Sequence, residues 1–175
     1  MLEVLILYIL INRDYTMYSI QKRIKESFGA YTMPSFGAIK PALVRLEKQN
    51  YLTTSKIMSD GGKLSVYYSL TKEGLKGLKE ILKSPMSSNP VQFLTDARIK
   101  LSCLSVSDND EQYEIYEDIK TNALMHKANA EKILNDEYTP LTFYQRIVLD
   151  NAICEYKNFI TLVENLEKEN ARNSR

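Results

Sequence analysis

The chain has 175 residues, of which 44% are apolar, and this is enough for one ordinary domain or two small ones. Its net charge of +1 hides an uneven distribution, because residues 1–83 carry 13 basic and 7 acidic side chains, whereas residues 84–175 carry 10 and 15. A single histidine and two distant cysteines exclude histidine-pair metal ligation and CxxC chemistry, so we expect no enzymatic activity, no metal and no cofactor. A basic half beside an acidic half is typical of a protein that meets a polyanion, although two independently solvated surfaces would give the same asymmetry.

The amino-terminal segment MLEVLILYILI is strongly apolar, but it is shorter than the ~20 residues that a membrane span requires. It contains Glu3, and it lacks the basic flank and the small-residue cleavage site of a secretory signal. We interpret residues 2–11 as a buried first helix and expect a cytoplasmic protein without membrane contact. Cys103 and Cys154 lie in apolar helical patterns, which indicates buried free thiols in a reducing compartment.

The second helix is predicted to begin after Thr16, whose side chain can cap it, and to stop at Gly29. Its apolar positions repeat every four residues at Ile20, Ile24 and Phe28. The third helix is predicted to end near Asn50 and to bury Ile39, Leu43 and Leu46. Pro41 lies within this helix and removes one backbone hydrogen bond, so we expect the helix to start late or to kink.

Two alternating segments follow the third helix and are joined at Asp60-Gly61-Gly62. In the second segment, residues 64–70, apolar and polar side chains alternate as in a half-buried strand. Thr71 is the predicted cap of a fourth helix, whose apolar face carries Leu75, Leu78 and Leu82. A helix followed at once by a glycine-tipped β-ribbon is typical of a winged helix-turn-helix, which places the helix in a DNA groove.

Residues 84–90, SPMSSNP, interrupt the helical pattern and form the predicted domain boundary. Beyond them we predict a short helix over residues 91–104 and two long helices over residues 111–135 and 140–170. Long helices with a full apolar face cannot enclose that face alone, so a symmetric second copy is expected to pack against them. The residues predicted to form this dimer contact are Ile119, Ala123, His126, Val148, Ala152, Phe159, Val163 and Leu166.

The basic half supplies what a DNA-binding face requires, which is a polar helical surface with Lys and Arg beside it. The predicted DNA-contacting residues are Tyr18, Lys22, Lys25, Ser35, Gly37, Lys40, Arg45 and Lys63. Each lysine or arginine taken alone is more typical of a solvated surface than of a DNA contact. Their order along a winged helix-turn-helix favours DNA, and Lys63 at the ribbon tip is placed to reach a phosphate.

The basic half resembles the PadR family of transcriptional regulators over residues 1–83. The segment MYSI at residues 17–20 is similar to the family's GYxI motif, and PSFGAIKPALVRLE at residues 34–47 is similar to PSxGSIYPxLxRLE. Further along, YSLTKEG at residues 68–74 is similar to YxLTxxG. The family commonly carries a proline where this chain has Pro41, so the resemblance implies that the third helix tolerates it.

Three residues depart from the family pattern. Met17 stands where Gly is usual, Lys40 where Tyr is usual and Val44 where a basic residue is frequent, which leaves base specificity open. The carboxy-terminal half is similar in size to that of the longer PadR subgroup, which resembles virulence activators of the AphA type. This resemblance implies a helical dimerisation arm.

The resemblance also implies a small aromatic effector as a second partner, because family members often respond to phenolic compounds. The tyrosines that are candidates to line an effector cavity are Tyr113, Tyr116, Tyr138, Tyr144 and Tyr156. Tyrosine at helical spacing is, however, more often part of a core or an interface, and the chain has no tryptophan to stack on a flat ligand.

The predicted fold is mainly α with a small β-hairpin. An N-terminal winged helix-turn-helix (residues 1–83) is joined by a linker (residues 84–90) to a C-terminal antiparallel helical dimerisation arm (residues 91–175). The predicted function is sequence-specific transcriptional regulation, by repression, through a homodimer on a pseudo-palindromic operator in double-stranded DNA. The alternative is a winged-helix protein-interaction module without DNA binding, for which an acidic or apolar third helix would be typical.

Overall fold

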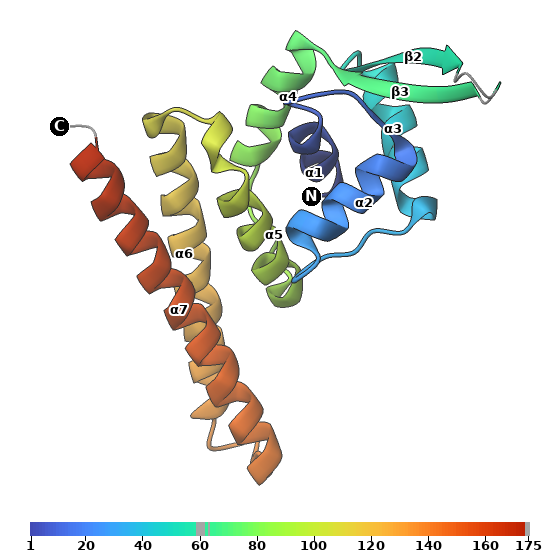
Figure 1. The fold of residues 1–175 in the computed structure, drawn as a ribbon. Helices are drawn as coiled ribbons and strands as arrows, with labels where there is room; N and C mark the ends of the chain where they lie inside the picture. Colours follow the sequence, from blue (N-terminus) through green and yellow to red (C-terminus); the bar gives the residue numbers. More distant parts are fainter. Residues whose placement is uncertain (59–61, 63, 174–175) are drawn as a thin grey trace. The chain divides into compact units, whose positions relative to one another are not determined.

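The computed structural model describes residues 1–58, 62 and 64–173 (Figure 1). The chain divides into two compact units, Met1–Ser84 with Thr95–Val106, and Pro85–Leu94 with Ser107–Arg175. Helix α5, Pro90–Ser102, therefore contributes residues to both units. No helix among the described residues is long and apolar enough to span a bilayer.

Residues 95–106 belong with the first unit, whereas the predicted boundary places them in the C-terminal half. Polar contacts explain this assignment. The hydroxyl groups of Tyr31 and Ser102 lie 2.6 Å apart, and the buried Lys100 ammonium donates a hydrogen bond to the carbonyl oxygen of Ser84. These contacts join positions far apart in sequence, so no local pattern could have predicted them.

Helix α1, Leu2–Ile9, lies at the centre of the first unit, and its residues 4–7 are fully buried. Helices α2 (Met17–Phe28), α3 (Phe36–Lys48) and α4 (Lys72–Lys83) pack around it (Figure 1). The prediction of a buried first helix is confirmed, although the helix ends two residues earlier than expected.

The sheet of the first unit has three antiparallel strands in the order β1-β3-β2. Strands β2 (Leu52–Met58) and β3 (Leu64–Leu70) form the predicted ribbon, and β1 (Tyr15–Thr16) adds to its edge. A two-residue strand is too short to show alternation, so the sequence did not predict β1. Thr16 also caps α2 by accepting a hydrogen bond from the Ser19 N–H at 3.3 Å, which fixes the start of α2 to the sheet.

The ribbon is covered only at its helix end. Leu64 and Val66, on the predicted half-buried face, are 54% and 36% exposed, whereas Tyr68 and Leu70 are half-buried. The predicted face therefore applies only to the second half of β3. Asp60, Gly61 and Lys63 lie outside the described residues, while Gly62 adopts a φ of +76°, which glycine tolerates.

Two glycines of α4, Gly74 and Gly77, pack against the connection between α3 and β2. Thr71 caps it as predicted, by accepting a hydrogen bond from the Gly74 N–H at 2.9 Å. A Cβ added at Gly74 would lie 2.1 Å from the Tyr51 carbonyl oxygen, and one added at Gly77 would lie 2.4 Å from the Tyr51 ring. Leu75, predicted to be on the buried face, is 39% exposed because the glycines occupy the contact side.

The second unit contains two long helices side by side, α6 (Asn109–Leu134) and α7 (Phe143–Asn173), joined by a short turn (Figure 1). Both were predicted from their apolar stripes. A capping box starts α6, in which Asp108 accepts a hydrogen bond from the Glu111 N–H while the Glu111 carboxylate accepts one from the Asp108 N–H.

Phe93, from the first turns of α5, packs between α6 and α7. It is fully buried, and its ring centroid lies 4.9 Å from that of His126 on α6 and 6.0 Å from that of Phe159 on α7. A single chain therefore encloses part of the apolar face that was predicted to need a second copy.

Candidate nucleic-acid interface

Helix α3 begins at Phe36, after Ser35, whose Oγ accepts a hydrogen bond from the Ala38 N–H at 3.3 Å. The expected late start is wrong, because the helix begins before Pro41, at Phe36, and continues through it. The bond that proline removes would end on the carbonyl of Gly37, an exposed residue that water can reach. The exposed face of α3 is therefore unbroken from its first turn.

Lys40 and Arg45, both predicted to contact DNA, have different surroundings on α3. Lys40 is exposed and forms no ion pair within the described residues. The Arg45 guanidinium instead bonds to the Glu3 carboxylate of α1, with Nε and Nη2 at 3.0 and 2.9 Å from Oε1. Arg45 is thus paired with α1, whereas Lys40 keeps its charge free for a partner.

The N-terminal parts of α2 and α3 share one exposed surface. The rings of Tyr18 and Phe36 stack with centroids 6.1 Å apart and an angle of 18° between them, and Tyr18 is 68% exposed. Gln21 Nε2 donates a hydrogen bond to the carbonyl oxygen of Pro34 at 3.2 Å. These contacts fix α2 against the start of α3.

Lys22 and Lys25 extend this surface along α2, as the sequence predicts. Both are exposed, and Lys22 Nζ lies 3.9 Å from a Glu26 oxygen, a solvated ion pair that contributes little. On the ribbon, Lys56 is exposed in β2. Cations thus flank α3 on the helix beside it and on the ribbon.

A hollow of about 360 Å³ beside α2 contains cations that the sequence analysis missed, Arg13 and Arg23, together with Lys22 and two carboxylates. Arg13 Nε donates a hydrogen bond to the Tyr15 hydroxyl at 2.6 Å, and the Arg13 guanidinium lies 4.9 Å from the Tyr15 ring centroid. This hydrogen bond, with the charges of Arg13 and Arg23, lowers the pKa of Tyr15. Because β1 positions Tyr15, no sequence signal could have found the hollow.

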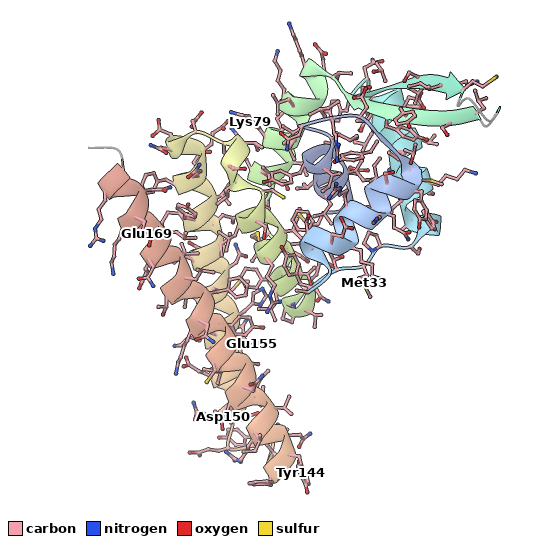
Figure 2. All side chains as sticks on the ribbon, in the orientation of Figure 1. Met33, Lys79, Tyr144, Asp150, Glu155 and Glu169 are labelled. Atoms are coloured by element: carbon pink, nitrogen blue, oxygen red, sulfur yellow. The ribbon has the colours of Figure 1, made fainter. Side chains whose placement is uncertain are left out.

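The eight residues predicted to form the dimer contact fall into three groups by burial. Five of them are buried within one chain: Ile119, Ala123, His126, Phe159 and Val163. Ala152 and Leu166 are half-buried, whereas Val148 is 68% exposed. Next to Val148, the start of α7 exposes further apolar side chains, and Tyr144 lies there beside the turn from α6 (Figure 2).

Comparisons with known proteins agree with the resemblance seen in the sequence. The model of the transcriptional regulator PadR-like family matches residues 6–80. A PadR family transcription regulator from Clostridium difficile R20291 is 30% identical, with 46% of this chain and 81% of that chain covered and a TM-score of 0.41. No curated protein sequence matches the chain.

Bacillus subtilis PadR has been solved with operator DNA and with p-coumaric acid. The operator complex is 18% identical, with 96% of this chain and 97% of that chain covered and a TM-score of 0.44. The p-coumaric acid complex is 19% identical, with coverage of 97% and 95% and a TM-score of 0.40.

Because these TM-scores are low, family membership rests on the family model and on the sequence identity to the C. difficile regulator. The matched residues contain α2, α3 and the ribbon, which form the winged helix described above. The chain belongs to the PadR-like family of transcriptional regulators.

Proposed function

We propose that this protein binds double-stranded DNA through α3 and represses transcription as a homodimer. The observation that carries the proposal is the group of exposed cations on α2 and α3, Lys22, Lys25 and Lys40, of which Lys40 has no ion pair within the described residues. Membership of a family of transcriptional regulators supports the same role. In this role the protein is a cytoplasmic DNA-binding factor and not an enzyme.

In the proposed complex the N-terminal half of α3 enters the major groove, because residues near the start of a recognition helix face the base edges. Cations on α2 and on the ribbon bind phosphates at either side, which fixes the orientation of α3 and makes affinity fall with salt. The proposed contact set is Tyr18, Lys22, Lys25, Ser35, Gly37, Lys40 and Lys63, to which the structure adds Arg13 and Arg23 as candidates.

A homodimer places two copies of α3 in successive major grooves of a pseudo-palindrome, with half-sites about 34 Å apart. We assign the dimer contact to the exposed apolar residues at the start of α7, which are Phe143, Tyr144, Ile147 and Val148. The N-terminal winged helix and the C-terminal helical arm then have the separate roles predicted for them. A dimer bound over a promoter excludes polymerase, which gives repression.

Lys40→Ala is expected to bind DNA from the protein's own promoter region about tenfold more weakly, because one base or phosphate contact contributes about 1–3 kcal/mol. Arg45→Ala removes the same charge from the same helix, but the Arg45 guanidinium is held by Glu3. The DNA affinity of Arg45→Ala should change less than about twofold. Gel retardation at low and moderate salt measures both effects.

Equal losses for the two variants, or no loss for either, would contradict this assignment of the two cations. No retardation of any promoter duplex at low salt would favour the alternative, a winged-helix module that binds protein. Retardation that salt weakens steeply is the expected wild-type behaviour, because phosphate binding releases counterions.

Regulation by a small aromatic effector is a second proposed function, and a cavity in the second unit supports it. The cavity has a volume of about 420 Å³ and is lined by residues from the start of α5, from α6 and from α7. His126 lines it, is 5% exposed, and has an Nε2 without a hydrogen-bond partner in the described chain. Tyr156 stacks on the imidazole with ring centroids 5.6 Å apart. An aromatic molecule with one polar group would supply a hydrogen-bond partner for His126 Nε2 and a ring to pack against Tyr156.

p-Coumaric acid is a suitable probe, because it is aromatic and carries polar groups at both ends. At about ten times its Kd it should stabilise the wild type by about 1.4 kcal/mol and raise the Tm by a few degrees. His126→Phe keeps an aromatic ring at this position but removes the polar atom, so the increase in Tm should disappear. An equal increase in both proteins would place the ligand elsewhere.

A further inference from the structure

The outward side of α3 is a mainly apolar seam. Helical periodicity places the seam residues Gly37, Pro41 and Val44 opposite the side that buries Ile39, Ala42, Leu43 and Leu46. Val44 is 45% exposed, and Phe36 at the start of the helix is 39% exposed. From Phe36 to Val44, Lys40 is the only residue with a polar side chain.

Three polar side chains at the two ends of α3, those of Ser35, Arg45 and Glu47, have partners within the chain. Ser35 caps the helix, and Arg45 is bonded to Glu3. The Glu47 carboxylate accepts a hydrogen bond from the Thr54 hydroxyl at 2.9 Å. Guanine is read by Arg or Lys and adenine by Asn or Gln, and of these the first turns of α3 contain only Lys40. From Phe36 to Val44, the side chains other than Lys40 offer only apolar contacts for distinguishing bases.

The cations around the seam indicate that its partner is a polyanion rather than an apolar protein surface. Lys40 lies beside the seam on α3, and Lys22 and Lys25 are exposed on α2. The major groove of DNA matches this combination, because phosphates line its rim while the 5-methyl group of thymine is the apolar group within it.

Gly37 gives independent support for a close approach to the groove. Glycine lowers helix stability relative to alanine. A Cβ added at Gly37 would meet only the Ser35 Oγ, at an ordinary distance of 3.6 Å. Packing within the chain therefore does not require glycine at this position. The missing side chain leaves the backbone of α3 open to a partner that comes near it.

We propose that α3 selects its operator through the 5-methyl groups of thymines, which Val44, Pro41 and Phe36 contact in the major groove. Lys40 supplies the one hydrogen-bonding contact from this part of the helix. The inference rests on the proposed DNA binding and adds the class of base that is read. Each half-site then carries thymines facing the seam, and replacing a thymine by deoxyuridine, which removes only the methyl group, weakens binding.

The experiment uses duplexes that the full-length wild-type protein enriches from a random-sequence pool. Thymines are replaced by deoxyuridine one position at a time in both half-sites, and affinity is measured for the wild type, Val44→Ala and Arg45→Ala. A buried methyl group corresponds to about fourfold in affinity, so a contacted pair of thymines should give a loss of about 16-fold in the wild type. Arg45→Ala, whose changed side chain is held by Glu3, should show the same loss.

Val44→Ala should lose its sensitivity to deoxyuridine at one position in each half-site, with less than about a twofold change remaining. Specific binding that no deoxyuridine substitution weakens would overturn the thymine reading and leave DNA binding intact. The same loss in Val44→Ala as in the wild type at every position would overturn the assignment to Val44. If no duplex is enriched, the proposed function itself fails. Circular dichroism of each variant verifies folding. Val44→Thr serves as a second variant at this position, because it keeps the branched shape of the side chain.

Discussion

Replacing Gly74 by alanine is expected to lower the free energy of unfolding by about 3 kcal/mol. The added methyl group would lie 2.1 Å from the Tyr51 carbonyl oxygen and 2.8 Å from Cδ1 of Leu70. The oxygen cannot retreat easily, because it accepts hydrogen bonds from the N–H and the hydroxyl group of Thr71 at 3.1 and 3.2 Å. Helix α4 must therefore move away from the connection between α3 and β2. Urea unfolding followed by circular dichroism measures the effect.

Two other glycines provide matched controls for Gly74→Ala. Gly37→Ala makes the same change where the new Cβ has room, so its stability should rise by about 0.5 kcal/mol. Gly77→Ala collides with the Tyr51 ring, which can move, and Tyr51→Leu should relieve that collision. Tyr51→Leu should not relieve Gly74→Ala, because there the collision is with the backbone. A Gly74→Ala protein as stable as the wild type would contradict this packing.

The features that the sequence predicted correctly are those with a local signal. Thr16 and Thr71 precede apolar stripes at helical spacing, and both cap the expected helices. The buried positions of α2 follow from four-residue spacing alone. The family resemblance was visible for the same reason, because its motifs are short and lie on these elements. Local pattern therefore identified the winged helix before any contact was known.

Features that depend on distant residues could not be predicted. The ion pair between Arg45 and Glu3 joins positions 42 residues apart, so no pattern within α3 could have predicted it. Strand β1 has two residues, and its partner strand lies more than 50 positions further along the chain. Arg13, which lies beside Tyr15 in the hollow next to α2, was missed for this reason.

The C-terminal helices show a different limit of sequence reasoning. One apolar stripe runs along α7 through Val148, Phe159 and Val163, and its periodicity is the same in a core and in an interface. The structure separates the two parts, because Phe93 helps to cover the stripe at Phe159 and leaves it open at Val148. The separation depends on where the start of α5 packs, and no pattern within α7 contains that information.

Val148→Glu is expected to convert the proposed dimer into a monomer, with the mass of one chain in light scattering. Phe143, Tyr144 and Val148 at the start of α7 are 70%, 78% and 68% exposed, an apolar group of a kind that marks a protein interface. In a two-fold symmetric contact the substitution occurs in both copies, so two carboxylates lose water in one interface. The helical content should not change, because the side chain is exposed in the single chain.

The same variant should lose about 100-fold in affinity for a complete operator, because the second half-site no longer benefits from being bound by a linked copy. Affinity for a single half-site should change little, since the winged helix is untouched. Lys157→Glu is the matched control, because it adds a carboxylate to an exposed position half a helical turn from the Val148 stripe. It should remain dimeric and keep its affinity for the operator.

A Val148→Glu protein that remains dimeric would show that the contact lies elsewhere. A monomer that still binds the complete operator as tightly as the wild type would show that dimerisation does not supply the affinity.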